Sequence, residues 1–435
     1  MPVTRLIKRA LATQTAQFLR RPSGADWDGQ TQLSQQEIDH MAQRILLPSL
    51  PVSDEEMARA QFQDRGQKMA RQENWPALSA AIRAADETRL ATPGGEMATM
   101  LLAYGARGDV TAAAEDALYD GVVPPSHGID ALEEAAEELP GDYPTALVTA
   151  LAHMDIGLAW RNLPKTITQI DITDRAARTH HHFARAAQLL APHCGLTHDA
   201  PSLAAAQCAL LAGQTPSQRQ VADDYEALIR LDPNSPKHLR AMGRALLPEC
   251  GGSLAQLELE ARRAATLTQS IWGAGGYTWV HLDALALDPD ALIRLDAEFF
   301  ADGMRDILAR RKNQHIANLL AAYCAAALKG APGAPGATPD SAATNAAKVD
   351  PATGTALRAL FEWVLSTHLQ ELHPLIWTEA LHRPGLATAL PSRRSLVRAG
   401  RHAALGMIAT VFADKLANGR SIAFSTAGMY QLDPM

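Results

Sequence analysis

Aromatic residues make up only 5% of this 435-residue chain. Runs of β-branched residues are scarce as well, which argues against a fold dominated by β-sheet. Alanine dominates the apolar residues, which are 47% of the chain. Ala and Leu are strong helix formers, and small side chains let helices pack closely. The composition therefore predicts an all-α protein with ample material for a buried core.

Cysteine is sparse too. The four cysteines, Cys194, Cys208, Cys250 and Cys324, include no Cys-x-x-Cys pair. This pattern fits neither a disulfide framework nor a zinc site, and it predicts reduced, mostly buried thiols in a cytoplasmic protein. No apolar run reaches the roughly 18 residues that a transmembrane helix requires. We therefore expect no membrane-spanning segment.

The charge balance excludes a further class of protein. The chain has 40 Lys and Arg against 47 Asp and Glu, a net charge of −7. A general nucleic-acid binder needs a basic face that displaces counterions from phosphates. Nucleic acid is therefore not an expected partner.

The first 30 residues form a basic segment without the apolar core and cleavage site of a secretory signal. Its cations precede the first acidic residue, Asp26, and are Arg5, Lys8, Arg9, Arg20 and Arg21. An apolar stripe at helical spacing consists of Val3, Ile7, Leu11 and Phe18. We expect an arm or helix over residues 1–30 that docks by this stripe. Attachment to an anionic membrane surface or an acidic partner is the alternative.

Helix boundaries are marked after this segment. Ser34 and Glu37 have the spacing of a capping box, which predicts a helix that begins near Gln35. Pro51 ends that region, and Ser53 with the acidic pair Asp54 and Glu55 predicts the start of the next helix.

Pairs of short helices then recur. In 62–86, one helical face carries Phe62, Gly66 and Met69, and the next carries Leu78, Ile82 and Ala85. We expect a partner helix to approach most closely at Gly66. A similar pattern begins at Met97, with a turn predicted at Gly108. The interval from Phe62 to Met97 is close to the period of helical-hairpin repeats.

The clearest junction is YEALIRLDPNSPKHLRAMGRALL, residues 225–247. Tyr225, Leu228 and Ile229 share one helical face, and Asp232-Pro233-Asn234 stops that helix. The apolar positions of the next helix are Leu239, Met242, Gly243 and Leu246. Upstream, Leu203, Ala206 and Leu210 have the same spacing as Leu239, Met242 and Leu246. The interval between the two sets is again close to the repeat period.

This junction resembles two adjoining tetratricopeptide (TPR) repeats. In that resemblance Tyr225, Leu228 and Pro233 match the second helix and its stop, and Leu239, Met242, Gly243 and Leu246 match the first helix. The usual first-helix aromatic is absent or replaced, connections are uneven, and LLPECGGS interrupts the unit after Leu246. The resemblance therefore implies an irregular α-solenoid of antiparallel helix pairs.

These patterns divide the chain into four segments. They are a basic arm over 1–30, a TPR-like solenoid over 31–328, a linker or mobile loop over 329–351, and a helical carboxyl-terminal module over 352–435. The linker is rich in Pro, Gly, Ala and Ser, and such a segment buries too little apolar surface to order itself. The final module ends with a helix stop at Asn418-Gly419 and a short strand or hairpin in RSIAFSTAGMYQL.

Motifs for common chemistries are missing. No GxSxG, GxxxxGK, HExxH or strand-linked GxGxxG is present. The glycine-rich segment Trp272–Trp279 lacks a preceding strand and a following Lys, so we interpret it as a turn between helices. His180, His181 and His182 point in different directions on a helix and are not expected to share a metal ion. Two Glu-x-x-His pairs, Glu37/His40 and Glu379/His382, fall short of a di-iron set. We therefore predict no metal, cofactor or catalytic residue.

A protein–protein interaction scaffold is the leading interpretation, because stacked helix pairs enclose a groove lined by first-helix side chains. The resemblance places Lys237, Arg240 and Arg244 in that groove, and in the earliest unit Gln63, Gln67 and Ala70. The three cations would share one face and favour an acidic peptide or a carboxyl terminus, while a solvated basic face without a ligand is the alternative.

An enzyme or small-molecule sensor is the competing class. Its site would lie in the densest polar cluster of the carboxyl-terminal module, which contains His368, Glu371, His373, Glu379 and His382. A helical cap with surface histidines explains the same residues without function.

Overall fold

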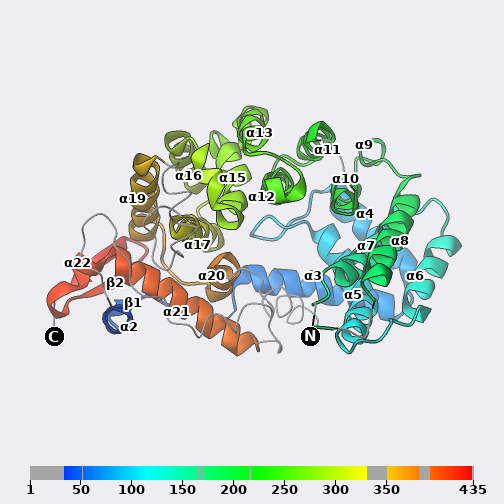
Figure 1. The fold of residues 1–435 in the computed structure, drawn as a ribbon, viewed down its shortest axis with the longest axis horizontal. Coiled ribbons are helices and arrows are strands. Elements are labelled where there is room, and N and C mark those ends of the chain that lie inside the picture. The colour runs from blue at the N-terminus through cyan, green and yellow to red at the C-terminus, as the bar shows by residue number, and fades with distance from the viewer. Residues whose placement is uncertain are drawn as a thin grey trace. The chain divides into compact units, whose positions relative to one another are not determined.

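The computed structural model describes residues 34–50, 52–164, 166–167, 171–214, 218–330, 350–381 and 392–433 (Figure 1). These residues fold mainly into α-helices, with three short strands among them, as the composition predicts. Within the described ranges, no helix is long and apolar enough to cross a membrane. The basic arm over 1–30 lies outside them, as does most of the predicted linker.

The chain divides into two compact units, one over Asp54–His238 and one over 239 onward together with the segment that ends at Ser53. This division differs from the predicted boundary at 329–351. Helix α17 (Gln314–Gly330), which precedes that segment, packs against α19 (Pro351–Thr367) and α20 (Pro374–Leu381), which follow it. The residues after the predicted linker therefore belong to the same unit as those between 239 and 328.

The first unit is built mainly of helices in its described residues. Its helices are α3 (Asp54–Arg71), α4 (Trp75–Glu87), α5 (Ala98–Tyr119), α6 (His127–Glu138), α7 (Tyr143–Arg161), α8 (Ile172–Leu190), α9 (Gly195–His198), α10 (Pro201–Leu210) and α11 (Gln218–Leu231), with a 3-10 turn at Leu211–Gly213. Helix α12 (Pro236–Ala245) begins in the last residues of the first unit and continues into the second. Helix α11 stops before Asp232-Pro233-Asn234, as predicted.

Helix α7 is the centre of this unit. It packs against α4, α5, α6, α8 and α10, and almost every residue from Tyr143 to Gly157 is buried. Asp142 caps the helix by accepting a hydrogen bond from the Thr145 N–H. A helix that is apolar all round is stable only inside a core, which explains why other helices cover it on several sides.

Helices α3 and α5 approach each other closely at glycine. A Cβ on Gly66 would lie 2.1 Å from the Leu102 carbonyl oxygen, and one on Gly105 would lie 1.9 Å from the Gln63 carbonyl oxygen. Gly66 is therefore a point of close approach, as predicted, but the helix that approaches it is α5 and not the following helix α4. The turn predicted at Gly108 is wrong, because Gly108 is buried inside the continuous helix α5.

The second unit combines helices with a small sheet. Its helices are α2 (Gln35–Ala42), α13 (Leu254–Leu267), α14 (Gln269–Trp272), α15 (Gly275–Leu287), α16 (Ala297–Arg310), α17 (Gln314–Gly330), α19 (Pro351–Thr367), α20 (Pro374–Leu381), α21 (Arg393–Val411) and α22 (Ala413–Leu416). Its 3-10 turns are Pro248–Cys250, Pro289–Ile293 and Ala417–Gly419. The capping box of Ser34 and Glu37 is present at the start of α2.

The sheet joins distant parts of the sequence. Strands β2 (Ser421–Ser425) and β3 (Gly428–Leu432) form the predicted terminal hairpin, with Ala423 opposite Tyr430. Strand β1 (Ile45–Leu46) pairs with β2 in parallel, with Ile45 opposite Ile422. This strand was not predicted, because two residues directly after a helix show no alternation.

Candidate functional site

The glutamines of the predicted groove lie inside the protein. Gln63 and Gln67 are only 3% and 9% exposed. Helix α5 covers this face of α3, and the Gln67 side chain donates a 2.8 Å hydrogen bond to the Asp109 carboxylate. The prediction that these residues face a solvent-filled groove is therefore wrong.

The three cations of α12 do not form a shared basic face. The Arg240 guanidinium is buried and donates two hydrogen bonds to the Asp283 carboxylate, at 2.6 and 2.9 Å. Burial alone would lower the pKa of Arg240, but the charge of Asp283 outweighs it and raises this pKa. Lys237 Nζ lies 3.8 Å from the Glu96 carboxylate, and Arg244 is exposed. Arg240 is thus a structural residue.

The residues of the alternative carboxyl-terminal cluster make separate contacts. His368 packs edge-on against Trp363, and the Glu371 carboxylate lies 3.0 Å from His373 Nε2. Glu379 is exposed, and His382 lies outside the described residues.

Asn318 explains why several polar groups gather in this cluster. It is fully buried on α17, accepts hydrogen bonds from the His373 N–H and Trp377 Nε1, and donates to the Gln314 and Glu371 carbonyls. These contacts tie α17 to α20 and account for the neighbouring polar residues without a ligand.

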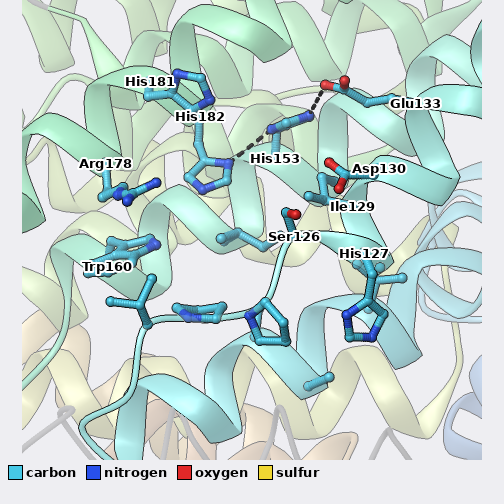
Figure 2. A pocket seen from close by; sticks show the side chains of 18 residues that line it. Ser126, His127, Ile129, Asp130, Glu133, His153, Trp160, Arg178, His181 and His182 are labelled. Atoms are coloured by element: carbon cyan, nitrogen blue, oxygen red, sulfur yellow. Dashed lines mark hydrogen bonds and ion pairs between the residues drawn. The ribbon is translucent and has the colours of Figure 1, made fainter.

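A different set of polar residues meets in the first unit. His153 Nδ1 lies 2.9 Å from His182 Nδ1, and His153 Nε2 lies 2.8 Å from the Glu133 carboxylate. The Arg185 Nε donates to the same Glu133 oxygen at 2.8 Å. Figure 2 shows the resulting order, with His153 between Glu133 and His182. Helices α6, α7 and α8 each contribute to this chain of hydrogen bonds.

Local contacts fix these helices at the site. The Thr149 hydroxyl of α7 lies 3.0 Å from the Leu132 carbonyl of α6, next to Glu133. Gly157, one turn after His153, leaves room for α8, because a Cβ there would lie 3.2 Å from His182 Cβ. The two imidazoles are therefore held by packed elements, which favours a defined geometry.

Both imidazoles are held neutral. Burial lowers the pKa of His153 despite its hydrogen bond to Glu133. Burial, together with the nearby His153, His181 and Arg178, lowers the pKa of His182 to about 4. Burial also acts to raise the pKa of Glu133, but hydrogen bonds from Arg185 and His153 lower it below its ordinary value. At neutral pH the site is therefore an ionised Glu133 followed by two neutral rings.

The His182 ring lines a cavity of about 190 Å³. We call it the His153–His182 cavity. In Figure 2 the His182 ring lies between the His153 ring and the side chains of Arg178 and Trp160. The apolar part of the remaining wall comes from α5, α6, α7 and the segment before α6, and includes Val110, Ala113, Ala114, Val123, Ile129 and Ile156. The polar residues Ser126, His127, Asp130, Glu133 and His181 also line the cavity.

Exposed apolar residues accompany the cavity. Val122 and Val123 are 57% and 49% exposed, and Tyr119 at the end of α5 is 40% exposed. Val123 itself lines the cavity, as do Pro124 and Pro125 after it. Proline fixes its own φ and restricts the residue before it, so this segment loses little entropy when a partner binds.

Metal binding is not indicated by this arrangement. Among the residues that the structure describes, no group of three or more His, Cys, Asp or Glu side chains is placed to hold a metal ion. His180 and His181 are exposed on α8, and the His181 ring packs edge-on against the His182 ring, while only His182 is hydrogen-bonded to His153.

The sequence carries one signal for this site. His153 stands in TALVTALAHMDIGLAW, an otherwise mostly apolar stretch, and a buried polar side chain needs a partner. The partners themselves, Glu133 and His182, lie on other helices, and no spacing rule connects them.

Searches against protein-family models, curated proteins and solved structures find no match to this chain.

Proposed function

We propose that this protein is a non-enzymatic interaction scaffold or adaptor, and that it holds a protein segment at the His153–His182 cavity. Consecutive helices that pack in pairs, such as α7 with α8 and α10 with α11, support the TPR-like arrangement of this proposal. The binding surface differs from the groove expected from the repeat resemblance.

One observation carries the proposal: a cavity with a polar end lies next to exposed apolar residues. The polar end is the His182 ring, and the exposed residues are Val122 and Val123. Protein interfaces are typically centred on an anchor side chain in a pocket and surrounded by apolar contacts. A segment that crosses Val122 and Val123 would place one side chain in the cavity.

Site-specific photo-crosslinking in cells tests this proposal. A photoreactive residue in place of Ala113, which is exposed and lines the cavity, should capture a partner protein. The matched control replaces Ala176, which is exposed on α8 and does not line the cavity. Crosslinks of equal yield and identity at both positions would contradict binding at the cavity.

Acid–base catalysis is a second candidate, supported by the Glu133–His153–His182 chain. A carboxylate that orients an imidazole is a common feature of general-base sites. In the described residues, however, no hydroxyl or thiol donates a hydrogen bond to His182. Turnover of an ester or amide probe that His182→Phe abolishes and His180→Phe retains would favour catalysis over binding alone.

A further inference from the structure

The hydrogen-bond chain determines which atom of His182 is free for a ligand. An ionised carboxylate only accepts hydrogen bonds, so His153 Nε2 donates to Glu133. In a neutral His153 the Nδ1 atom then carries no proton and accepts from the Nδ1–H of His182. A neutral His182 is therefore unprotonated at Nε2. His182 Nε2 is thus a hydrogen-bond acceptor on a ring that lines the cavity.

The apolar part of the cavity has the character of an aromatic pocket. Ile156 and Trp160 are buried beside it and belong to one cluster with Ala114, and Val110 and Ile129 pack against that cluster. A cavity of about 150 Å³ with apolar walls is large enough for benzene. The volume of about 190 Å³ here leaves room for a six-membered ring with one small substituent.

We propose that the anchor in the His153–His182 cavity is a tyrosine side chain of the protein partner, with its hydroxyl donating to His182 Nε2. This inference rests on the proposed function and adds the chemistry of the anchor. Tyrosine combines an apolar ring with one hydroxyl donor, which is why it is frequent at interfaces.

Other anchors fit the cavity less well. A phenylalanine would fill the apolar part but leave the His182 acceptor unpaired, which costs free energy when the group is desolvated. A carboxylate would face the unprotonated nitrogen of His182. An ammonium group would meet Arg178, which lies one helical turn from His182, as well as the carboxylates of Asp130 and Glu133, so the lysine analogue is the competing ligand in the test.

Binding of amino-acid amides to the full chain tests the inference. N-acetyl-tyrosinamide should bind about 2- to 12-fold more tightly than N-acetyl-phenylalaninamide, the ratio expected from one net neutral hydrogen bond. The preference should disappear in His182→Phe and remain in His180→Phe, a matched change at an exposed position of the same helix. Ala113→Trp should weaken both ligands, and Ala176→Trp should weaken neither.

A measurement on the wild-type protein covers the case in which His182→Phe does not fold. The 15N resonance of His182 Nε2 should shift when N-acetyl-tyrosinamide is added, and should move far less with the phenylalanine analogue. Equal affinities for the two ligands, or tighter binding of N-acetyl-lysinamide, would overturn the assignment of tyrosine.

The proposed function can fail or stand independently of this inference. Suppose that the protein crosslinked at position 113 binds at the cavity, and that none of its tyrosines is needed for this binding. The scaffold proposal then stands and the tyrosine anchor is wrong. If no partner contacts the cavity, both are wrong.

Discussion

At the scale of single residues, polar groups in this protein are buried where they find a specific partner. Arg240 with Asp283, and His153 with Glu133 and His182, are the clearest examples. A buried polar group without a hydrogen-bond partner costs more free energy than a satisfied hydrogen bond contributes to stability. Removing one member of either set should therefore destabilise the protein by a measurable amount.

The first prediction concerns His182 and pH. His182→Phe leaves His153 Nδ1 without its partner, so it should lower the free energy of unfolding by about 1–3 kcal/mol at pH 7. The pKa of His182 is about 4 in the folded protein and about 6.5 when unfolded. The folded state thus binds fewer protons between these values, and the wild type loses stability as pH falls through that window.

Chemical denaturation at several pH values checks this prediction. The difference in free energy of unfolding between wild type and His182→Phe should narrow from pH 7 to pH 4. Only the wild type loses stability through His182 over this range, because the variant lacks that imidazole. Glu133, His153, Arg178 and His181 surround His182 in both proteins, so their contributions largely cancel. A difference that is constant over this range would contradict the assigned protonation. His180→Phe should change little at any pH.

The second prediction concerns the buried ion pair. Arg240→Met removes the guanidinium that pairs with the buried Asp283 carboxylate and should destabilise the protein by about 3–5 kcal/mol. Arg244→Met, on the same helix and exposed, should stay within about 0.5 kcal/mol of wild type. Thermal or urea unfolding gives both values. Similar effects of the two changes would show that Arg240 is solvated.

At the scale of elements, several helix boundaries could be predicted from caps and stops in the sequence. Ser34, Asp54 and Asp232-Pro233-Asn234 mark boundaries that the structure retains. Pairing between elements was harder to predict. The sequence suggested that α3 pairs with the next helix, whereas its main neighbour is α5. Glycines in both α3 and α5 allow this contact, and the sequence pattern does not say which helix fills the space.

The third prediction tests this contact. In Gly105→Ala the new methyl group would meet the Gln63 carbonyl, so the backbones of α3 and α5 must separate. Overpacking of this kind costs about 1–3 kcal/mol, against a gain in helix propensity of about 1 kcal/mol. The net result should be a loss of stability in urea unfolding.

Gly354→Ala is the matched control for that change. Gly354 lies inside α19 with no atom within 4 Å of a new Cβ, so alanine there should stabilise the protein slightly. If Gly105→Ala stabilises the protein as Gly354→Ala does, the close approach of α3 and α5 is wrong.

At the scale of the whole molecule, the composition was sufficient to predict an all-α chain without a membrane span in its described residues. The candidate site was not predicted, because its members come from three helices and are joined only by tertiary packing. Patterns along one helix pointed to the α12 cations instead. They did not reveal that Asp283 neutralises the central one.

The central claim is that a protein segment binds at the His153–His182 cavity. The most direct measurement compares the affinity of a peptide from the crosslinked partner for wild type, Ala113→Trp and Ala176→Trp. The account predicts at least about tenfold weaker binding to Ala113→Trp, as for the loss of an interface anchor, and unchanged binding to Ala176→Trp. Equal affinity for all three folded proteins would contradict it.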